Sequence, residues 1–145
     1  MSDEYKKAIA LWKRDRSGYI AVDLDGTLAE FHTWKGPYHI GAPIVKMQER
    51  VKKWLAEGIE VKILTARATP DMDGNADPAV VAAIRAWCKL HLGQGLDVTN
   101  AKTYDMIEIW DDRAVQVIPN TGERADGKED SCCYNGKCLE CLPNE

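Results

Sequence analysis

The sequence predicts an α/β protein with a Rossmann-like open parallel sheet and no large cap domain. Two observations carry this prediction. Segments with the composition of strands alternate with segments of helical periodicity, which is typical of parallel sheets. Clusters of polar residues follow three of the expected strands, and open parallel sheets bind their ligands at the carboxyl ends of the strands.

The length and composition indicate one globular domain. The chain has 145 residues, of which 45% are hydrophobic and 29% charged, so neither a disordered nor a membrane-embedded chain is expected. No apolar run reaches the length of a transmembrane helix, and residues 1–16 mix both charges without the apolar stretch of a secretory signal. We therefore expect a cytoplasmic protein without membrane partners. The net charge of −4 argues against binding long duplex nucleic acid, and nothing in the sequence indicates an oligomeric state.

The first half of the chain is expected to form a helix and then a β-α-β unit. Residues 3–15 have the pattern of an amphipathic helix. Tyr19–Leu24 is almost continuously apolar, which is typical of a strand that is buried on both faces. The next helix is expected to take Pro43 as its first residue and to end at Gly58. Ile59–Thr65 then reads as a second strand, parallel to the first.

Asp77 followed by Pro78 predicts the N-cap and first turn of another helix. Its apolar stripe carries Cys88 and His91. We expect Cys88 to be a small buried apolar residue, and His91 to be a core or boundary histidine rather than a metal ligand.

Three more strands are expected: Leu96–Thr99, Met106–Trp110 and, at an edge of the sheet, Val115–Ile118. Beyond Pro119 the composition becomes polar and rich in glycine. The packed domain is therefore expected to span residues 1–118, and residues 119–145 to form a polar, cysteine-rich tail.

Residues 20–26, IAVDLDG, end a buried strand with two carboxylates. Asp23 and Asp25 are expected to point to the same side, because alternate residues of a strand share a face. Their charges repel each other unless a cation compensates them. Asp111 and Asp112 follow another expected strand and can help to hold Mg²⁺, which prefers oxygen ligands and keeps positions open for phosphate oxygens. The same pattern recurs as DMDG at residues 71–74, but without a preceding strand, so a turn is expected there.

These residues, in this order, resemble the motifs of the haloacid dehalogenase-like (HAD) superfamily of phosphatases and mutases. The resemblance covers about residues 18–118. DLDGT at residues 23–27 is similar to the first motif, and ILTAR, with Thr65, to the second. Lys102 can serve as the third, and the acidic pair of residues 111–112 as the fourth.

Within the superfamily, the chain is similar to the 3′-phosphatase domain of phage polynucleotide kinases. It shares with that domain the segments DLDGTLA, Gly36-Pro37-Tyr38, TAR, Asp77-Pro78 and WDDR, in the same order. The resemblance implies a HAD-like fold and a Mg²⁺-dependent phosphomonoesterase that acts on a phosphorylated small molecule, a nucleotide or a 3′-phosphorylated nucleic-acid end.

The resemblance also implies a role for each motif residue. Asp23 would be the nucleophile that forms an aspartyl-phosphate, and Asp25 the general acid and base. Mg²⁺ would be held by Asp23, the backbone carbonyl of Asp25 and Asp111, with Asp112 as a ligand either directly or through water. The residues expected to bind phosphate are Thr65, Lys102, Arg67, Gly26 and Thr27.

Arg67 and Arg113 each follow a motif residue, and each can either contact substrate phosphate or pair with nearby acids. The segment Ala29–Ala42 is too short for a large cap, so an open site is expected. Residues 31–39 are rich in aromatic side chains, which can stack a nucleobase or sugar, or pack the loop onto the domain. Both interpretations stay open at this stage.

The tail ends with four cysteines whose spacing suits a small structural zinc site. Free thiols and disulfides are the alternatives, although a cytoplasmic location disfavours disulfides. The four cysteines are Cys132, Cys133, Cys138 and Cys141.

The rival to the enzyme hypothesis is a non-catalytic protein that uses the aromatic loop and the tail for partner contacts.

Overall fold

A computed structural model describes residues 2–4, 6–7 and 17–129 of the chain. The chain divides into two units, and each is described by itself. One unit is Trp12–Ala114, and the other combines Met1–Leu11 with Val115–Glu145.

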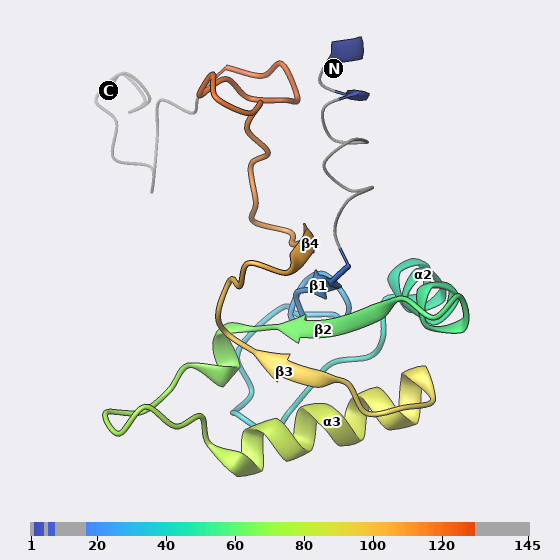
Figure 1. Cartoon of the computed structure of the whole chain (residues 1–145). Coiled ribbons are helices and arrows are strands. Elements are labelled where there is room, and N and C mark those ends of the chain that lie inside the picture. Colours follow the sequence, from blue (N-terminus) through green and yellow to red (C-terminus); the bar gives the residue numbers. More distant parts are fainter. Residues whose placement is uncertain (1, 5, 8–16, 130–145) are drawn as a thin grey trace, which may run out of the picture. The chain divides into compact units, whose positions relative to one another are not determined.

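The larger unit contains a four-stranded sheet in which all neighbouring strands are parallel, in the order β3-β2-β1-β4 (Figure 1). This confirms the expected α/β class and open parallel sheet. The described part of this unit also has two α-helices and one 3₁₀ turn. In chain order the elements are β1 (Tyr19–Val22), α2 (Val45–Ala56), β2 (Glu60–Leu64), η1 (Ala66–Ala68), α3 (Pro78–Leu92), β3 (Asp97–Thr99) and β4 (Met106–Trp110).

Strand β1 lies in the middle of the sheet, and all four of its side chains are buried. Ile20 and Val22 belong to the main core, which includes residues of both α2 and α3. Tyr19 and Ala21 pack in a second cluster with Met106 of β4. Burial on both faces explains why this strand is almost continuously apolar in the sequence.

Helix α2 begins at Val45 with Ile44 as its N-cap, so the prediction that Pro43 is the first helical residue is wrong. Pro43 instead pairs with Ala29 in an isolated antiparallel bridge. This pairing keeps the chain extended until Ile44, and the helix starts after it. The expected end of the helix is confirmed, because Gly58 follows the C-cap with a φ of 78°.

Helix α3 begins as predicted. The Asp77 carboxylate accepts a hydrogen bond from the backbone N–H of Ala79 at 2.9 Å, and Pro78 is the first helical residue. Cys88 is fully buried, and burial raises the pKa of its thiol to about 11. The ring of His91 lies 4.7 Å from that of Trp87, at the boundary of the core, as expected.

The prediction of an edge strand at Val115–Ile118 is wrong. Within the described residues this segment forms only an isolated antiparallel bridge, between Val117 and Arg124. The turn after Pro119 folds the chain back, so that Ile118 and Gln116 bond to residues 123 and 125 instead of a sheet neighbour. Val115 and Val117 are each 50% exposed, so the segment does not bury its apolar side chains as a strand of the sheet would.

Of residues 3–15, the described residues 3, 4, 6 and 7 are helical, and the rest of that expected helix lies outside the described residues. No helix among the residues that the structure describes is long and apolar enough to cross a membrane.

Candidate active site

Polar side chains from all four strand ends line one cleft. Because the strands are parallel, their carboxyl ends lie at the same edge of the sheet. Asp23 follows β1, Thr65 follows β2, Lys102 lies beyond β3 and Asp111 follows β4. All four line a cleft of about 640 Å³.

Three carboxylates lie close together at this edge of the sheet, and two of them, Asp23 and Asp111, line the cleft. Asp23, Asp111 and Asp112 each offer an oxygen atom, and these three atoms lie within 4.8 Å of one another. A backbone hydrogen bond of 2.8 Å from Asp23 N–H to the carbonyl of Trp110 ties the end of β1 to the end of β4. Two segments nearly 90 residues apart in the sequence thus form one acidic triad, the name used below for these three side chains.

The acidic neighbours of Asp23 affect its own ionisation. The pKa of its carboxyl is raised from 3.8 to about 7, first by burial, then by a hydrogen bond with Asp112 and by the charge of Asp111. Burial and neighbouring negative charge both disfavour the ionised form. Either a proton or a metal ion therefore stabilises this cluster.

The turn after β1 is built to bring the two acidic segments together. Gly26 has a φ of 86°, and a Cβ atom there would lie 2.6 Å from Oδ2 of Asp112. The Thr27 hydroxyl lies 3.2 Å from Asp23 and 3.3 Å from Asp112, and it accepts a 3.0 Å hydrogen bond from the Asp112 N–H.

Gly26 and Thr27 were expected to bind phosphate, but their backbone N–H groups already form hydrogen bonds within the protein. The N–H of Gly26 donates to the carbonyl of Ala29, and the N–H of Thr27 donates to the carbonyl of Leu24. What the geometry supports for the pair is a bracing role, in which they join Asp23 to Asp112.

Asp25 is not a member of the triad, because its side chain pairs with Arg67. Nε of Arg67 donates to one carboxylate oxygen at 2.7 Å, and Nη2 donates to the other at 2.8 Å. Such two-pronged pairs are short and well oriented. The Arg67 side chain is only 6% exposed. Of the two roles expected for Arg67, the structure shows pairing with a nearby acid.

Arg67 also holds the loop of residues 30–42, called the 30–42 loop below. Its Nη1 donates to the carbonyls of Gly36 and Pro37, at 3.4 and 3.0 Å. Its guanidinium carbon lies 4.8 Å from the ring centre of Trp34. One buried side chain of η1 therefore joins the 30–42 loop to Asp25.

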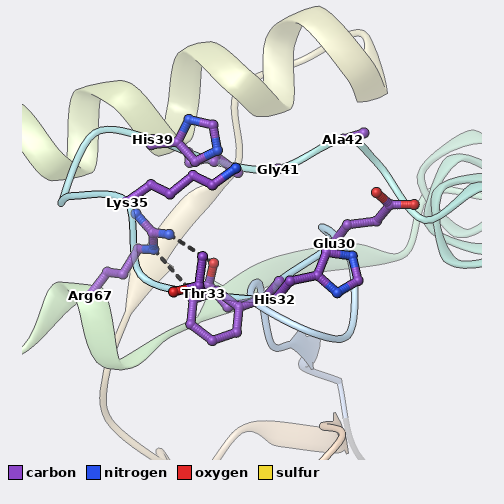
Figure 2. A pocket seen from close by; sticks show the side chains of 11 residues that line it. Glu30, His32, Thr33, Lys35, His39, Gly41, Ala42 and Arg67 are labelled. Carbon is purple, nitrogen blue, oxygen red and sulfur yellow. Dashed lines mark hydrogen bonds and ion pairs between the residues drawn. The ribbon is translucent and has the colours of Figure 1, made fainter.

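A second, smaller cavity of about 240 Å³ lies between this loop and the Asp25–Arg67 pair (Figure 2). Figure 2 shows the hydrogen bonds of Arg67 as dashed lines, with Lys35 and His39 on one side of the cavity and His32 on the other. Asp25, Phe31 and Arg67 line both this cavity and the larger cleft.

Thr65 is the N-cap of η1 and is 3% exposed, and its hydroxyl accepts a hydrogen bond from the Arg67 N–H. Lys102 and Arg113 line the cleft from its rim. Neither forms an ion pair within the part of the chain that the structure describes, so both cations face the cleft without a fixed acidic partner.

Three features were missed at the level of sequence. Thr69 and Asn100 also line the cleft, and the acid that pairs with Arg67 is Asp25. Asn100 directly follows β3. Because ligands bind at the carboxyl ends of parallel strands, the argument that identified Asp23 also applies to Asn100. The Asp25–Arg67 pair has no local sequence signal.

The second DxDG segment is a turn, as expected. The Asp71 carboxylate accepts hydrogen bonds from the N–H groups of Asp73 and Asn75, at 2.9 and 3.1 Å. The cysteines of the expected zinc site, residues 132, 133, 138 and 141, lie outside the described residues. Comparison of the chain with family models, curated proteins and solved structures gives no match.

Proposed function

We propose that the protein is a Mg²⁺-dependent phosphomonoesterase of the HAD type, with Asp23 as the nucleophile. The observation that carries the proposal is the acidic triad, which places Asp23 within 4.8 Å of two further carboxylates in a cleft lined by Thr65 and Lys102. A nucleophilic carboxylate, a cation site and groups for phosphoryl oxygens are the parts that such a reaction needs.

The donor set fits Mg²⁺ better than a softer metal. All three side chains offer carboxylate oxygens, and the structure brings no histidine or cysteine into the described cluster. Asp23, Asp111 and Asp112 would hold the ion, together with the Asp25 carbonyl. When bound, Mg²⁺ would neutralise charge between the carboxylates and the phosphate.

The chain's own residues carry the bond changes. In the first step a carboxylate oxygen of Asp23 attacks phosphorus and the bond from phosphorus to the ester oxygen breaks, which yields an aspartyl-phosphate and an alcohol. Asp25 gives a proton to the departing oxygen. In the second step a water oxygen attacks phosphorus, Asp25 takes a proton from that water, and Asp23 leaves with release of inorganic phosphate.

The Asp25–Arg67 pair suits the second step, in which Asp25 takes a proton as a carboxylate. For the first step Asp25 has to carry a proton, and its contact with Arg67 has to loosen, because a guanidinium favours the ionised form. The two hydrogen bonds from Arg67 fix the plane of the Asp25 carboxylate, and each oxygen keeps a lone pair for proton transfer. Asp23, by contrast, has no basic side chain among the partners that shift its pKa. Arg67 is therefore a positioning residue for the acid and base.

Thr65 and Lys102 complete the proposal on the phosphate side. The buried Thr65 hydroxyl and the Lys102 ammonium would hold phosphoryl oxygens and offset charge in the transition state. Arg113, on the same rim, is a further cation for an anionic substrate.

Hydrolysis of an aryl phosphate with Mg²⁺ and with a chelator tests the proposal. We expect activity only with the metal, and a loss of at least about 10³-fold in kcat for Asp23→Asn. Asp73→Asn, in the second DxDG segment, is the matched control and should keep full activity. Activity that is indifferent to chelation, or that survives Asp23→Asn, would contradict the mechanism.

A further inference from the structure

Two exposed aromatic side chains line the same cleft as the acidic residues. Phe31 is 38% exposed and Trp34 is 58% exposed, and both lie along the cleft with Asp23 and Asp25. Isolated apolar residues on a surface need no explanation, but two rings that line one cleft form a contact surface. Phe31 and Trp34 are called the ring platform below.

The ring platform sits on a loop whose two ends are fastened together. The Glu30 N–H donates to the Ala42 carbonyl at 2.8 Å, next to the bridge of Ala29 with Pro43. Gly41 lies so close to the Glu30 carbonyl that no side chain would fit there. The two ends of the loop are therefore held together at its base.

The far part of the loop is fastened by Arg67. This side chain bonds to two loop carbonyls and lies over one face of Trp34, while it also holds Asp25. The position of the indole is thus coupled to that of the acid and base. More than half of Trp34 stays exposed after this contact, so the loop is anchored without using up its aromatic surface.

Tyr38 shows what an aromatic residue of this loop looks like without such a role. It is also 58% exposed, but it lines neither the cleft nor the smaller cavity. Among the Phe, Trp and Tyr residues of this loop, all of which the structure describes, Phe31 and Trp34 line the cleft together with Asp23.

We propose that the ring platform binds a planar ring carried by the alcohol portion of the substrate, so that the enzyme selects phosphomonoesters of ring-bearing alcohols. This inference rests on the proposed phosphatase function. Stacking on aromatic side chains is tolerant of the identity of the ring, because every such ring has a π-face. The preference is therefore for the presence of a ring near the ester rather than for one base. A nucleobase and a simple aryl group are the two sources of such a ring.

Two matched pairs of substrates distinguish the effect of the ring on kcat/KM from the effect of the leaving group. Adenosine 5′-phosphate and ribose 5-phosphate share the same ester oxygen and sugar, and only the first carries a base. Phenylethyl phosphate and butyl phosphate make the corresponding pair for an aryl ring. We expect kcat/KM to be about tenfold higher for the ring-bearing member. A preference in the first pair alone identifies a nucleobase, and a preference in both identifies any planar ring.

Trp34→Leu should lower kcat/KM for adenosine 5′-phosphate several-fold more than kcat/KM for ribose 5-phosphate, and so remove most of this preference. Trp34→Phe keeps a ring and should restore at least half of the preference. Tyr38→Leu is the control, matched in loop and exposure, and should keep the full preference. Two results would contradict the proposed role of the ring platform. One is an equal kcat/KM of the wild type for adenosine 5′-phosphate and ribose 5-phosphate, and the other is an equal loss of kcat/KM on both substrates in Trp34→Leu.

A binding measurement separates this inference from the proposed function. In the Asp23→Asn protein, calorimetric titration with adenosine 5′-phosphate and with ribose 5-phosphate reports the platform without turnover. Tighter binding of the first by about tenfold, lost in the double variant with Trp34→Leu, supports the platform even when no hydrolysis occurs. Equal affinities overturn it even when the wild type is an active phosphatase.

Discussion

Asp23 and Asp25 stand two residues apart at the end of the same strand, yet their surroundings are opposite. Asp23 faces two more carboxylates, and the pKa of its carboxyl is raised to about 7. Asp25 is held by two hydrogen bonds from Arg67, whose side chain is almost completely buried. The charge of one aspartate is compensated within the fold, and that of the other is not.

This difference shows how one short segment can support two chemical roles. A carboxylate paired with arginine is oriented and complete in the protein alone. A carboxylate among like charges is incomplete, because it needs a proton or a cation. Variants that remove these partners test whether the different surroundings of Asp23 and Asp25 give them different roles. Four such tests follow, from the largest expected effect to the smallest.

Removal of one charge from the acidic triad should have the largest effect. We expect Asp111→Asn to raise the Kd for Mg²⁺ at least about 100-fold, because even indirect partners of a metal site contribute 10–100-fold. Calorimetric titration with Mg²⁺ measures this. Asp73→Asn should keep the wild-type Kd, and a similar Kd in both variants would remove the triad as the metal site.

Removal of the partner of Asp25 should have the next largest effect. Arg67→Gln takes away both hydrogen bonds that orient the acid and base, and we expect kcat for ribose 5-phosphate to fall about 10–100-fold. With 4-nitrophenyl phosphate, whose leaving group needs little protonation, the loss should be below about threefold. Equal losses on both substrates would show that Arg67 does not act through Asp25.

Loosening of the brace between Asp23 and Asp112 should have a moderate effect. Thr27→Val removes the hydroxyl that bonds to both segments, and Mg²⁺ affinity is expected to fall about tenfold, as for an indirect partner of a metal site. Thr27→Ser keeps the hydroxyl and should retain most of the affinity. A Kd that is unchanged in Thr27→Val would mean that the turn alone positions the triad.

The smallest effect concerns stability without metal. The pKa of Asp23 is higher in the folded state than its ordinary value of 3.8, so its ionisation opposes folding. This penalty grows as the pH rises from about 4 to 7 and is constant above that range. Because Asp23 is partly exposed, we discount the penalty to about 1–2 kcal/mol, or about 2–8 °C in Tm.

Asp23→Asn should therefore raise the Tm of metal-free protein at pH 8, and raise it much less at pH 4. Thermal unfolding followed by circular dichroism measures both. A variant that is less stable than the wild type at pH 8 would show that the raised pKa of Asp23 does not describe the folded protein.

The local pattern of the sequence was enough to predict most of the elements. Periodic apolar residues and caps such as Asp77 depend only on near neighbours in the chain, and the helix that begins at Pro78 is where the pattern placed it. The position of acids after strand ends also predicted that Asp23, Asp111 and Asp112 would lie near each other, since parallel strands bring their carboxyl ends to one edge. It grouped Asp25 with them as well, whereas the Asp25 side chain pairs with Arg67. Errors arose where a local signal competed with a contact from elsewhere, as at Pro43, which pairs with Ala29.

Only the tertiary structure decided how the charges are compensated. The sequence contains DLDG and DMDG, and in both the aspartates stand two residues apart. The first lies at the end of a buried strand beside β4 and becomes part of an acidic triad, and the second is an exposed turn that bonds to its own backbone. Arg67 likewise became the partner of Asp25 because η1 brings it there from 42 residues away. Coulombic and hydrogen-bonding energies depend on distance in space, and distance in space between remote segments exists only after the chain has folded.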